Sequence, residues 1–174
     1  MKKLMILMIC FLSIVSCKNS DAEKVNETFT KFAEAYKKSH DFLSVPKDLL
    51  SKNLLYFFNR AQTEEANSAE AIQKSEFPTD KPDMIEGDVF SSVYDGFNEY
   101  KILKTDVKND AATLKLELKN TESQPAITWK DECIMVKENG SWKIDNFIYG
   151  QPSASGAKST QEVFIAEYGS LPVE

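Results

Sequence analysis

The stretch AATLKLEL, residues 111–118, decides the fold class of this 174-residue chain. Leucine stands at positions 114, 116 and 118, and a charged residue follows each one. This alternation is typical of a strand in an antiparallel sheet that has one face on a core and the other in water. The centre of the chain is therefore predicted to be a β-sheet.

Further strand-like stretches lie on both sides. YKILKTDV (residues 100–107) is joined to this strand by a turn at Asn109-Asp110, and AITWKDECIMVK (126–137) follows it after a loop. SWKIDNFIY (141–149) comes last, after a hairpin turn whose Gly140 supplies the positive φ that such loops need. We therefore expect a four-stranded antiparallel meander, with Trp142 and Ile144 pointing into the core.

Helices are predicted before and after this sheet. Apolar residues at spacings of four, three and four run from Val25 to Tyr36 and predict a helix from about Asp21 to Ser39. A second helix is expected to open at Ser44-Val45-Pro46, since proline is tolerated in a first turn. Residues 64–74 either continue it or form a separate helix, and residues 160–169 predict a short closing helix.

This order of elements predicts an α+β fold, with N-terminal helices packed on a curved four-stranded antiparallel sheet and a short C-terminal helix. Residues 17–150 would form the helical layer and the sheet. Residues 151–174 would add a flexible stretch and the closing helix of the same domain. No nucleic acid is expected as a partner, because the chain is acidic.

Residues 1–16 have the layout of a secretory signal. Lys2 and Lys3 precede the apolar run LMILMICFLSIV, which is too short to span a bilayer as a retained helix. The sequence Ile14-Val15-Ser16-Cys17 that ends it resembles the lipobox of bacterial lipoproteins. In that family the cysteine thiol receives a diacylglycerol, the signal is cut just before it, and the new N-terminus is acylated. Cys17 is thus the expected lipid attachment site; the alternative is an ordinary signal with an incidental cysteine.

Removal of this segment changes the charge and the cysteine count. The 21 basic residues fall by two against 27 acidic ones, so the formal net charge goes from −6 to −8. Of three cysteines, Cys10 leaves with the signal and Cys17 carries lipid, so Cys133 remains alone. A single cysteine cannot form an intramolecular disulfide, and we expect Cys133 to be buried and inert.

The layout resembles a bacterial lipoprotein family of unknown function that carries a nuclear-transport-factor-like (cystatin-like) α+β cone domain. The matching residues are Gly87-Asp88-Val89-Phe90, and Gly140-Ser141-Trp142-Lys143-Ile144 in the last hairpin. The resemblance implies a cone fold and an envelope location, and no reaction. Because Lys18 replaces the aspartate that retains lipoproteins at the inner membrane in some bacteria, the outer membrane is the expected location.

Acid and base candidates are few. Enzymes of the cone superfamily use pocket carboxylates or a histidine, and the single histidine, His40, is better placed as a helix-capping cation beside Asp41. Asp131 and Glu132 interrupt an apolar strand and point to opposite faces, so one of them looks into the concave side as a possible base, or lies at a rim in water. No cofactor is expected.

An acidic loop precedes the sheet. Its carboxylates could hold a hard cation such as calcium, although a solvated loop is the alternative that we favour; they are Asp80, Asp83, Glu86 and Asp88.

An aromatic segment follows this loop. Its members, spaced four, three and three residues apart, are Phe90, Tyr94, Phe97 and Tyr100. In one interpretation a short helical turn packs them in the core. In the other they form a recognition edge together with Asp88 and Asp95, because tyrosine combines an apolar body with a hydrogen-bonding tip.

Three hypotheses on function follow. The first is a non-catalytic, lipid-anchored binding module of the cell envelope that docks an unknown envelope protein or a small apolar ligand. The second is a pocket enzyme with Asp131 or Glu132 as base, and the third is an immunity-type inhibitor of a toxin. The sites expected for a partner or a pocket are Asp88, Phe90, Tyr94, Asp95, Phe97 and Asp131.

Overall fold

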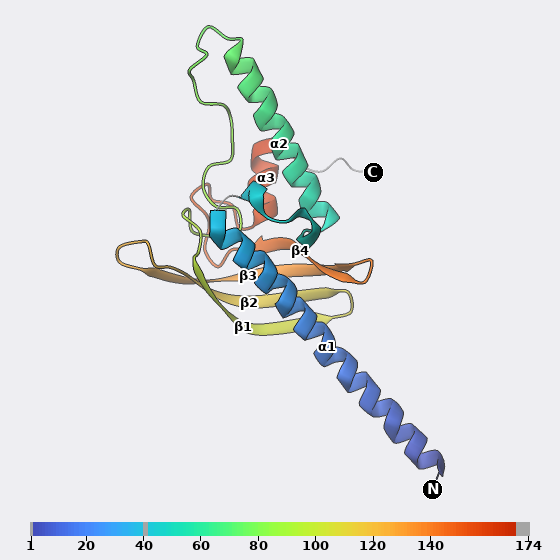
Figure 1. Cartoon of the computed structure of the whole chain (residues 1–174). Coiled ribbons are helices and arrows are strands. Elements are labelled where there is room, and N and C mark those ends of the chain that lie inside the picture. Colours follow the sequence, from blue (N-terminus) through green and yellow to red (C-terminus); the bar gives the residue numbers. More distant parts are fainter. Residues whose placement is uncertain (1, 40–41, 170–174) are drawn as a thin grey trace.

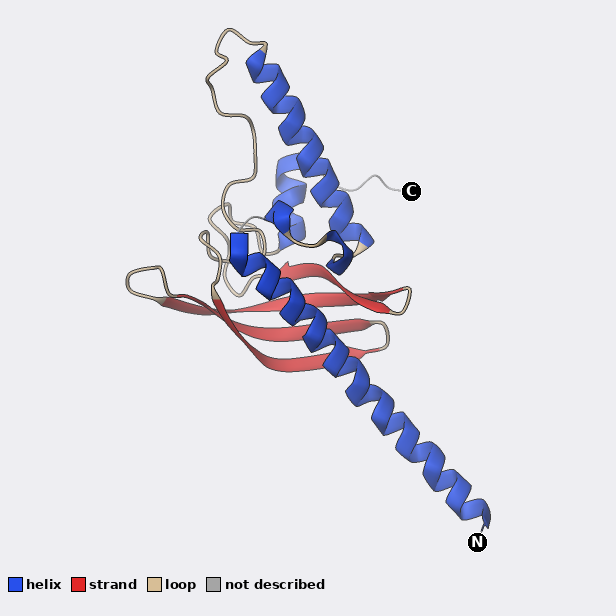
Figure 2. Ribbon diagram, in the orientation of Figure 1, coloured by secondary structure: helices blue, strands red, loops and turns tan. Residues whose placement is uncertain are grey.

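The computed structural model describes the backbone of residues 2–39 and 42–169, and the side chains of this part from residue 21 onward. In this part, three α-helices lie on one face of a four-stranded antiparallel sheet (Figure 1; Figure 2). The helices are α1 (Lys2–Ser39), α2 (Lys52–Gln73) and α3 (Thr160–Tyr168). The predicted α+β fold is confirmed, whereas His40 and Asp41 lie outside the described residues.

The sheet is the predicted meander, with strand order β1-β2-β3-β4. Its strands are β1 (Glu99–Lys108), β2 (Ala111–Asn120), β3 (Ile127–Glu138) and β4 (Ser141–Ile148). Both predicted hairpin turns are present, with φ of 55° at Asn109, 51° at Asn139 and 80° at Gly140. Leu114, Leu116 and Leu118 are all fully buried, as their alternation with charged residues predicts.

Helix α1 crosses the sheet from β1 to β4 (Figure 1). It ends at Ser39 as predicted, but it begins at Lys2 and not near Asp21. The physical reason is that neither glycine nor proline interrupts residues 4–20, so the apolar run continues the same helix. Among the described residues, none of the helices combines the length and apolar character needed to cross a membrane.

The expected start of the second helix is wrong. Leu50 is extended and forms a parallel bridge with Ile144, and Ser51 caps the helix by accepting a hydrogen bond from the backbone N–H of Leu54 at 3.0 Å. Two short 3₁₀ turns, Phe42–Ser44 and Lys47–Leu49, precede this cap. From Lys52 the helix is continuous to Gln73, and its second half extends beyond the sheet (Figure 1).

The helix-covered face of the sheet is filled by aromatic side chains. The ring of Phe32 lies 4.8 Å from that of Phe90 and 5.6 Å from that of Phe147, measured between centroids. Trp142 is 4% exposed and Ile144 is fully buried, as predicted. Cys133 is a free, buried thiol among the described residues, and its burial raises its pKa well above the usual value. The domain is thus stabilised by a packed core.

Candidate functional site

The segment between α2 and β1 is an irregular loop where its aromatic spacing suggested a helical turn. Gly87 and Gly96 have φ of 82° and 66°, which a right-handed helix cannot accommodate. The backbone N–H of Asp88 donates to the carbonyl of Tyr94 at 2.8 Å and so closes the loop on itself. The expected helical turn is therefore wrong, and the backbone brings Asp88 and Tyr94 together instead.

The aromatic residues of this loop divide between the two interpretations. Phe90 and Phe97 are fully buried and belong to the core. Tyr100, which lies on β1, is half-buried with its ring 5.4 Å from that of Phe29. Tyr94 is 52% exposed, and its neighbour Asp95 is exposed as well. The recognition edge is thus reduced to Tyr94 and Asp95, while the two phenylalanines hold the loop in place.

Hydrogen bonds tie this loop to three other parts of the fold. The carbonyl of Val89 accepts from the hydroxyl of Tyr149 at 2.7 Å and from the hydroxyl of Thr160 at 2.5 Å. The side-chain amide of Asn120, at the end of β2, donates to the carbonyls of Asp95 and Gly96 at 3.4 and 3.0 Å. Tyr94 and Asp95 are therefore carried by a loop that the scaffold holds firmly.

Asp131 is one of the residues that hold the loop. Its carboxylate is 2% exposed and accepts four hydrogen bonds. The donors are the backbone N–H and hydroxyl of Ser92 at 2.8 and 2.9 Å, the indole N–H of Trp129 at 2.9 Å, and the N–H of Gly150 at 2.7 Å. A rim position in water is therefore wrong for Asp131, since fixed donors engage both of its oxygens.

Glu132 lies on the opposite face of β3, as the pleat predicts. Its carboxylate is 3.5 Å from the ammonium of Lys115, and its side chain is 40% exposed. This places Glu132 on the solvent face of the sheet, away from the helices. Of the two carboxylates that the strand sequence suggested as a base, Asp131 is thus held by hydrogen bonds and Glu132 by an ion pair.

The four carboxylates proposed for a cation do not come together. Asp80, Asp83 and Glu86 are exposed, and Glu86 forms an ion pair with Lys81. Across the described side chains, no three His, Cys, Asp or Glu residues lie close enough to share a metal ion. Only Asp88 turns inward, so it is the member of this set that belongs to a site.

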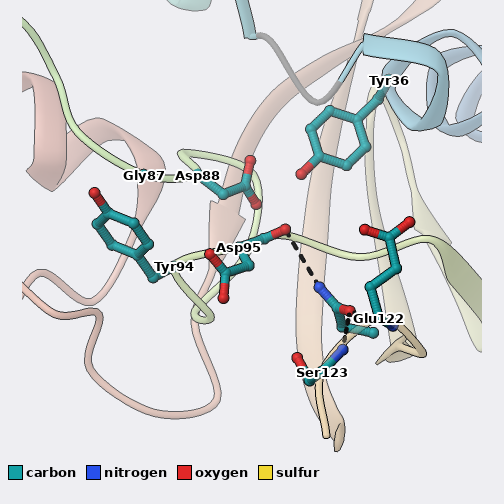
Figure 3. Close-up of a pocket in the computed structure, with 8 residues that line it drawn as sticks. Tyr36, Gly87, Asp88, Tyr94, Asp95, Glu122 and Ser123 are labelled. Atoms are coloured by element: carbon teal, nitrogen blue, oxygen red, sulfur yellow. Dashed lines mark hydrogen bonds between the residues drawn. The ribbon is translucent and has the colours of Figure 1, made fainter. Parts of the chain in front are cut away.

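Asp88 lines a pocket of about 520 Å³ at the end of the sheet (Figure 3). We call this the acidic pocket; it is lined by Tyr36, Gly87, Asp88, Tyr94, Asp95, Asn120, Glu122 and Ser123. These residues come from the end of α1, the loop before β1 and the turn between β2 and β3. The volume is within the range of small-ligand and side-chain pockets.

Burial controls the charge of Asp88. Its Oδ2 atom is buried and has no hydrogen-bond partner, and this loss of hydration raises the pKa of the carboxyl from 3.8 to about 6. The hydroxyls of Ser91 and Tyr36 and the N–H groups of Phe90 and Val89 lie close enough to lower the pKa in part, but none of them completes a hydrogen bond to Oδ2. Burial and the nearby Asp88 charge raise the pKa of Tyr36, so its hydroxyl stays protonated.

Two glycines give the pocket its shape. A Cβ atom on Gly96 would lie 1.9 Å from the Tyr36 hydroxyl oxygen, and one on Gly87 would lie 2.5 Å from the ring of Tyr94. Each glycine therefore allows a tyrosine to approach the backbone closely. The Gly87-Asp88 pair was visible in the sequence as part of a motif, whereas Tyr36 looked like an ordinary core residue.

The turn residues Glu122 and Ser123 carried no sequence signal beyond polarity. They reach the pocket because the carbonyl oxygen of the Asn120 side chain accepts hydrogen bonds from their backbone N–H groups, at 2.9 and 3.1 Å (Figure 3).

Comparisons with protein-family models, curated proteins and solved structures found no match for this chain.

Proposed function

We propose that this chain is a lipid-anchored binding module of the bacterial cell envelope that docks a protein partner at the end of the domain containing the acidic pocket. One observation carries the proposal: exposed Tyr94 and Asp95 stand at the pocket on a loop that Asp131, Asn120 and Tyr149 hold in place. Groups that bind proteins are characteristically presented by loops on a rigid scaffold. Tyrosine is enriched among the residues that dominate binding energy.

Two observations favour surface docking over the other hypotheses. The concave face is packed with aromatic rings such as Phe32, Phe90 and Phe147, which occupy the place of a small apolar ligand. Asp131 accepts four hydrogen bonds from fixed donors, so one of the two carboxylates named in the enzyme hypothesis already has a structural role. An immunity-type inhibitor would be one form of such a docking module, with a toxin as the partner.

The anchor in this proposal is the lipid on Cys17. It is supported by the lipobox-like sequence Ile14-Val15-Ser16-Cys17 after a short apolar run. An acylated cysteine with more than one chain binds membranes stably. The envelope location, with the outer membrane expected from Lys18, follows from the same segment.

Replacing Tyr94 or Asp95 tests the docking surface. Tyr94→Ala and Asp95→Ala should each weaken capture of the partner by at least about tenfold, because a central aromatic or charged contact contributes 2 kcal/mol or more. Capture would be measured from detergent-solubilised envelopes with quantitative mass spectrometry, and stability by thermal melting. Both variants should melt close to the wild type, since the two side chains are exposed.

Phe77→Ala is the matched control, because Phe77 is 60% exposed and does not line the pocket. It should leave capture unchanged. The proposal fails if Tyr94→Ala and Asp95→Ala retain every partner that the wild type and the Phe77 variant retain.

A further inference from the structure

The acidic pocket holds negative charge that the fold does not neutralise. Asp88, Asp95 and Glu122 all line it, and no lysine or arginine is among its described lining residues. Two acidic residues that do not line the pocket do form ion pairs: Glu86 pairs with Lys81, and Glu99 pairs with Lys119 at 2.9 Å. None of the ion pairs found among the described side chains involves the three pocket carboxylates.

A second, independent observation comes from Asp88. Its Oδ2 atom is buried and lacks a hydrogen-bond donor, while the residue lines the pocket beside Tyr36 and Tyr94 (Figure 3). Buried carboxylate oxygens in folded proteins are almost always satisfied, so an unsatisfied one indicates a position that a donor of a ligand can complete. The neighbouring Asp131, with four donors, shows how the same fold satisfies a carboxylate that is purely structural.

We propose that the acidic pocket binds an alkylammonium or guanidinium group, supplied by a lysine or arginine side chain of the docked partner. This inference rests on the proposed function, because it names the group of the partner that enters the pocket. The ligand donates to Asp88 and is attracted by Asp95 and Glu122 at the mouth. Anions are repelled by the same three carboxylates.

The aromatic walls suit the same ligand. The ring of Tyr94 lies over Gly87, and the hydroxyl of Tyr36 lies against Gly96. Tyr94 is 52% exposed at the pocket, so the methylene chain of a basic residue would contact its apolar ring surface while its charged end meets the carboxylates. Tyr36 is fully buried, so its ring offers no free surface to the ligand. A cation on an apolar stem therefore matches the pocket better than a small inorganic ion does.

Defined probes test this without the partner. The full chain in non-ionic detergent would be titrated with N-acetyl-lysine methylamide and, as neutral control of nearly the same shape, N-acetyl-norleucine methylamide, with binding followed by NMR shifts. The lysine probe should bind at least about tenfold more tightly than the norleucine probe, as expected for a charge-assisted pair. Asp88→Asn should weaken the lysine probe about tenfold and Glu122→Gln severalfold. Asp106→Asn, the same charge change at an exposed position on β1, should have no effect.

Equal binding of the two probes would overturn the inference, and so would unchanged lysine binding by both Asp88→Asn and Glu122→Gln. n-Pentylammonium tests whether the cation comes from a protein side chain or from a free small amine. The inference is supported if the lysine probe binds at least as tightly as n-pentylammonium. Tighter binding of the free amine overturns the assignment to a partner side chain. If Tyr94→Ala loses the partner while Asp88→Asn keeps it, the proposed function stands and only this inference fails.

Discussion

The carboxylates of Asp131 and Asp88, both near the acidic pocket, differ in how the fold satisfies their oxygens. Asp131 is surrounded by donors from Ser92, Trp129 and Gly150, so its ionised form is solvated by the protein itself. Asp88 is half-buried, and its Oδ2 atom is buried without a hydrogen-bond partner. A carboxylate of the first kind stabilises a fold, whereas one of the second kind costs stability until a ligand completes it. Sequence patterns do not distinguish the two, because three of the four donors of Asp131 come from residues 19 and 39 positions away.

Asp131→Ala should destabilise the domain strongly. It would leave the N–H groups of Ser92 and Gly150 and the indole of Trp129 without their acceptor, so we expect a loss of about 3–5 kcal/mol in the free energy of unfolding. Urea denaturation would measure it. Glu132→Ala, one residue away on the solvent face, should cost less than about 1 kcal/mol. Similar losses for the two variants would mean that the carboxylate of Asp131 is not the link described here.

Asp88 should make stability depend on pH. Its pKa is raised from 3.8 to about 6, so the folded state binds the proton more tightly than the unfolded state does. The resulting stabilisation is present below about pH 4 and is lost as the pH rises through about 6; a shift of this size corresponds to about 3 kcal/mol. Tyr36 and Tyr149, whose raised pKa values keep them neutral, face this carboxyl, and Asp95 and Glu122 share its pocket.

Asp88→Asn removes the titrating group and should therefore raise the melting temperature at pH 7.5 while leaving it nearly unchanged at pH 4. The comparison of wild type and variant by thermal melting at both pH values isolates this effect from other carboxylates. A variant that is less stable than the wild type at pH 7.5 would show that the ionised carboxylate stabilises the loop.

The elements differ in how well the sequence predicts them. Each strand agrees with its prediction to within two residues at either end, because alternation and the turn residues Asn109 and Gly140 are local signals. Local sequence does not locate the start of α2, because Leu50 is held extended by Ile144, which lies 94 residues further along the chain. The loop before β1 differs from the predicted helical turn for a similar reason: Gly87 and Gly96 have positive φ, and hydrogen bonds to Tyr149 and Asn120 hold the loop.

The last hairpin should be a major source of stability. Trp142 on β4 is 4% exposed, and the ammonium of Lys137 lies 5.4 Å from the centre of its ring. Trp142→Ala should cost about 3–5 kcal/mol, the range for truncation of a buried large aromatic side chain. Chemical denaturation would measure the loss, with exposed Phe77→Ala expected within about 0.5 kcal/mol of the wild type. A loss below about 1 kcal/mol for Trp142→Ala would mean that the hairpin contributes little to the core.

At the scale of the whole molecule, α1 connects the proposed lipid to the acidic pocket. Asp21, four residues after Cys17, binds Lys137 at 3.1 Å, beside the turn between β3 and β4. Tyr36, near the other end of α1, lines the pocket with the turn between β2 and β3. Because a helix rises 1.5 Å per residue, Cys17 and Tyr36 are separated by roughly 28 Å along α1. A lipid on Cys17 would therefore hold the β3–β4 turn near the membrane and direct the pocket away from it.

This orientation gives the last prediction. Single cysteines would be introduced as Asn139→Cys in the β3–β4 turn and as Ser123→Cys at the pocket, and each would be labelled with a fluorophore; Cys133 is fully buried. In vesicles that contain headgroup-quenching lipids, the label at 139 should be strongly quenched and the label at 123 hardly at all, because β3 separates the two turns by roughly 35–40 Å. Adding Cys17→Ser should abolish quenching at 139 and move the protein to the soluble fraction or leave it unprocessed. Equal quenching at both positions would contradict the orientation, and quenching that persists in the Cys17→Ser variant would contradict the lipid anchor. A pocket directed away from the membrane is the arrangement that a docking module needs to reach a partner.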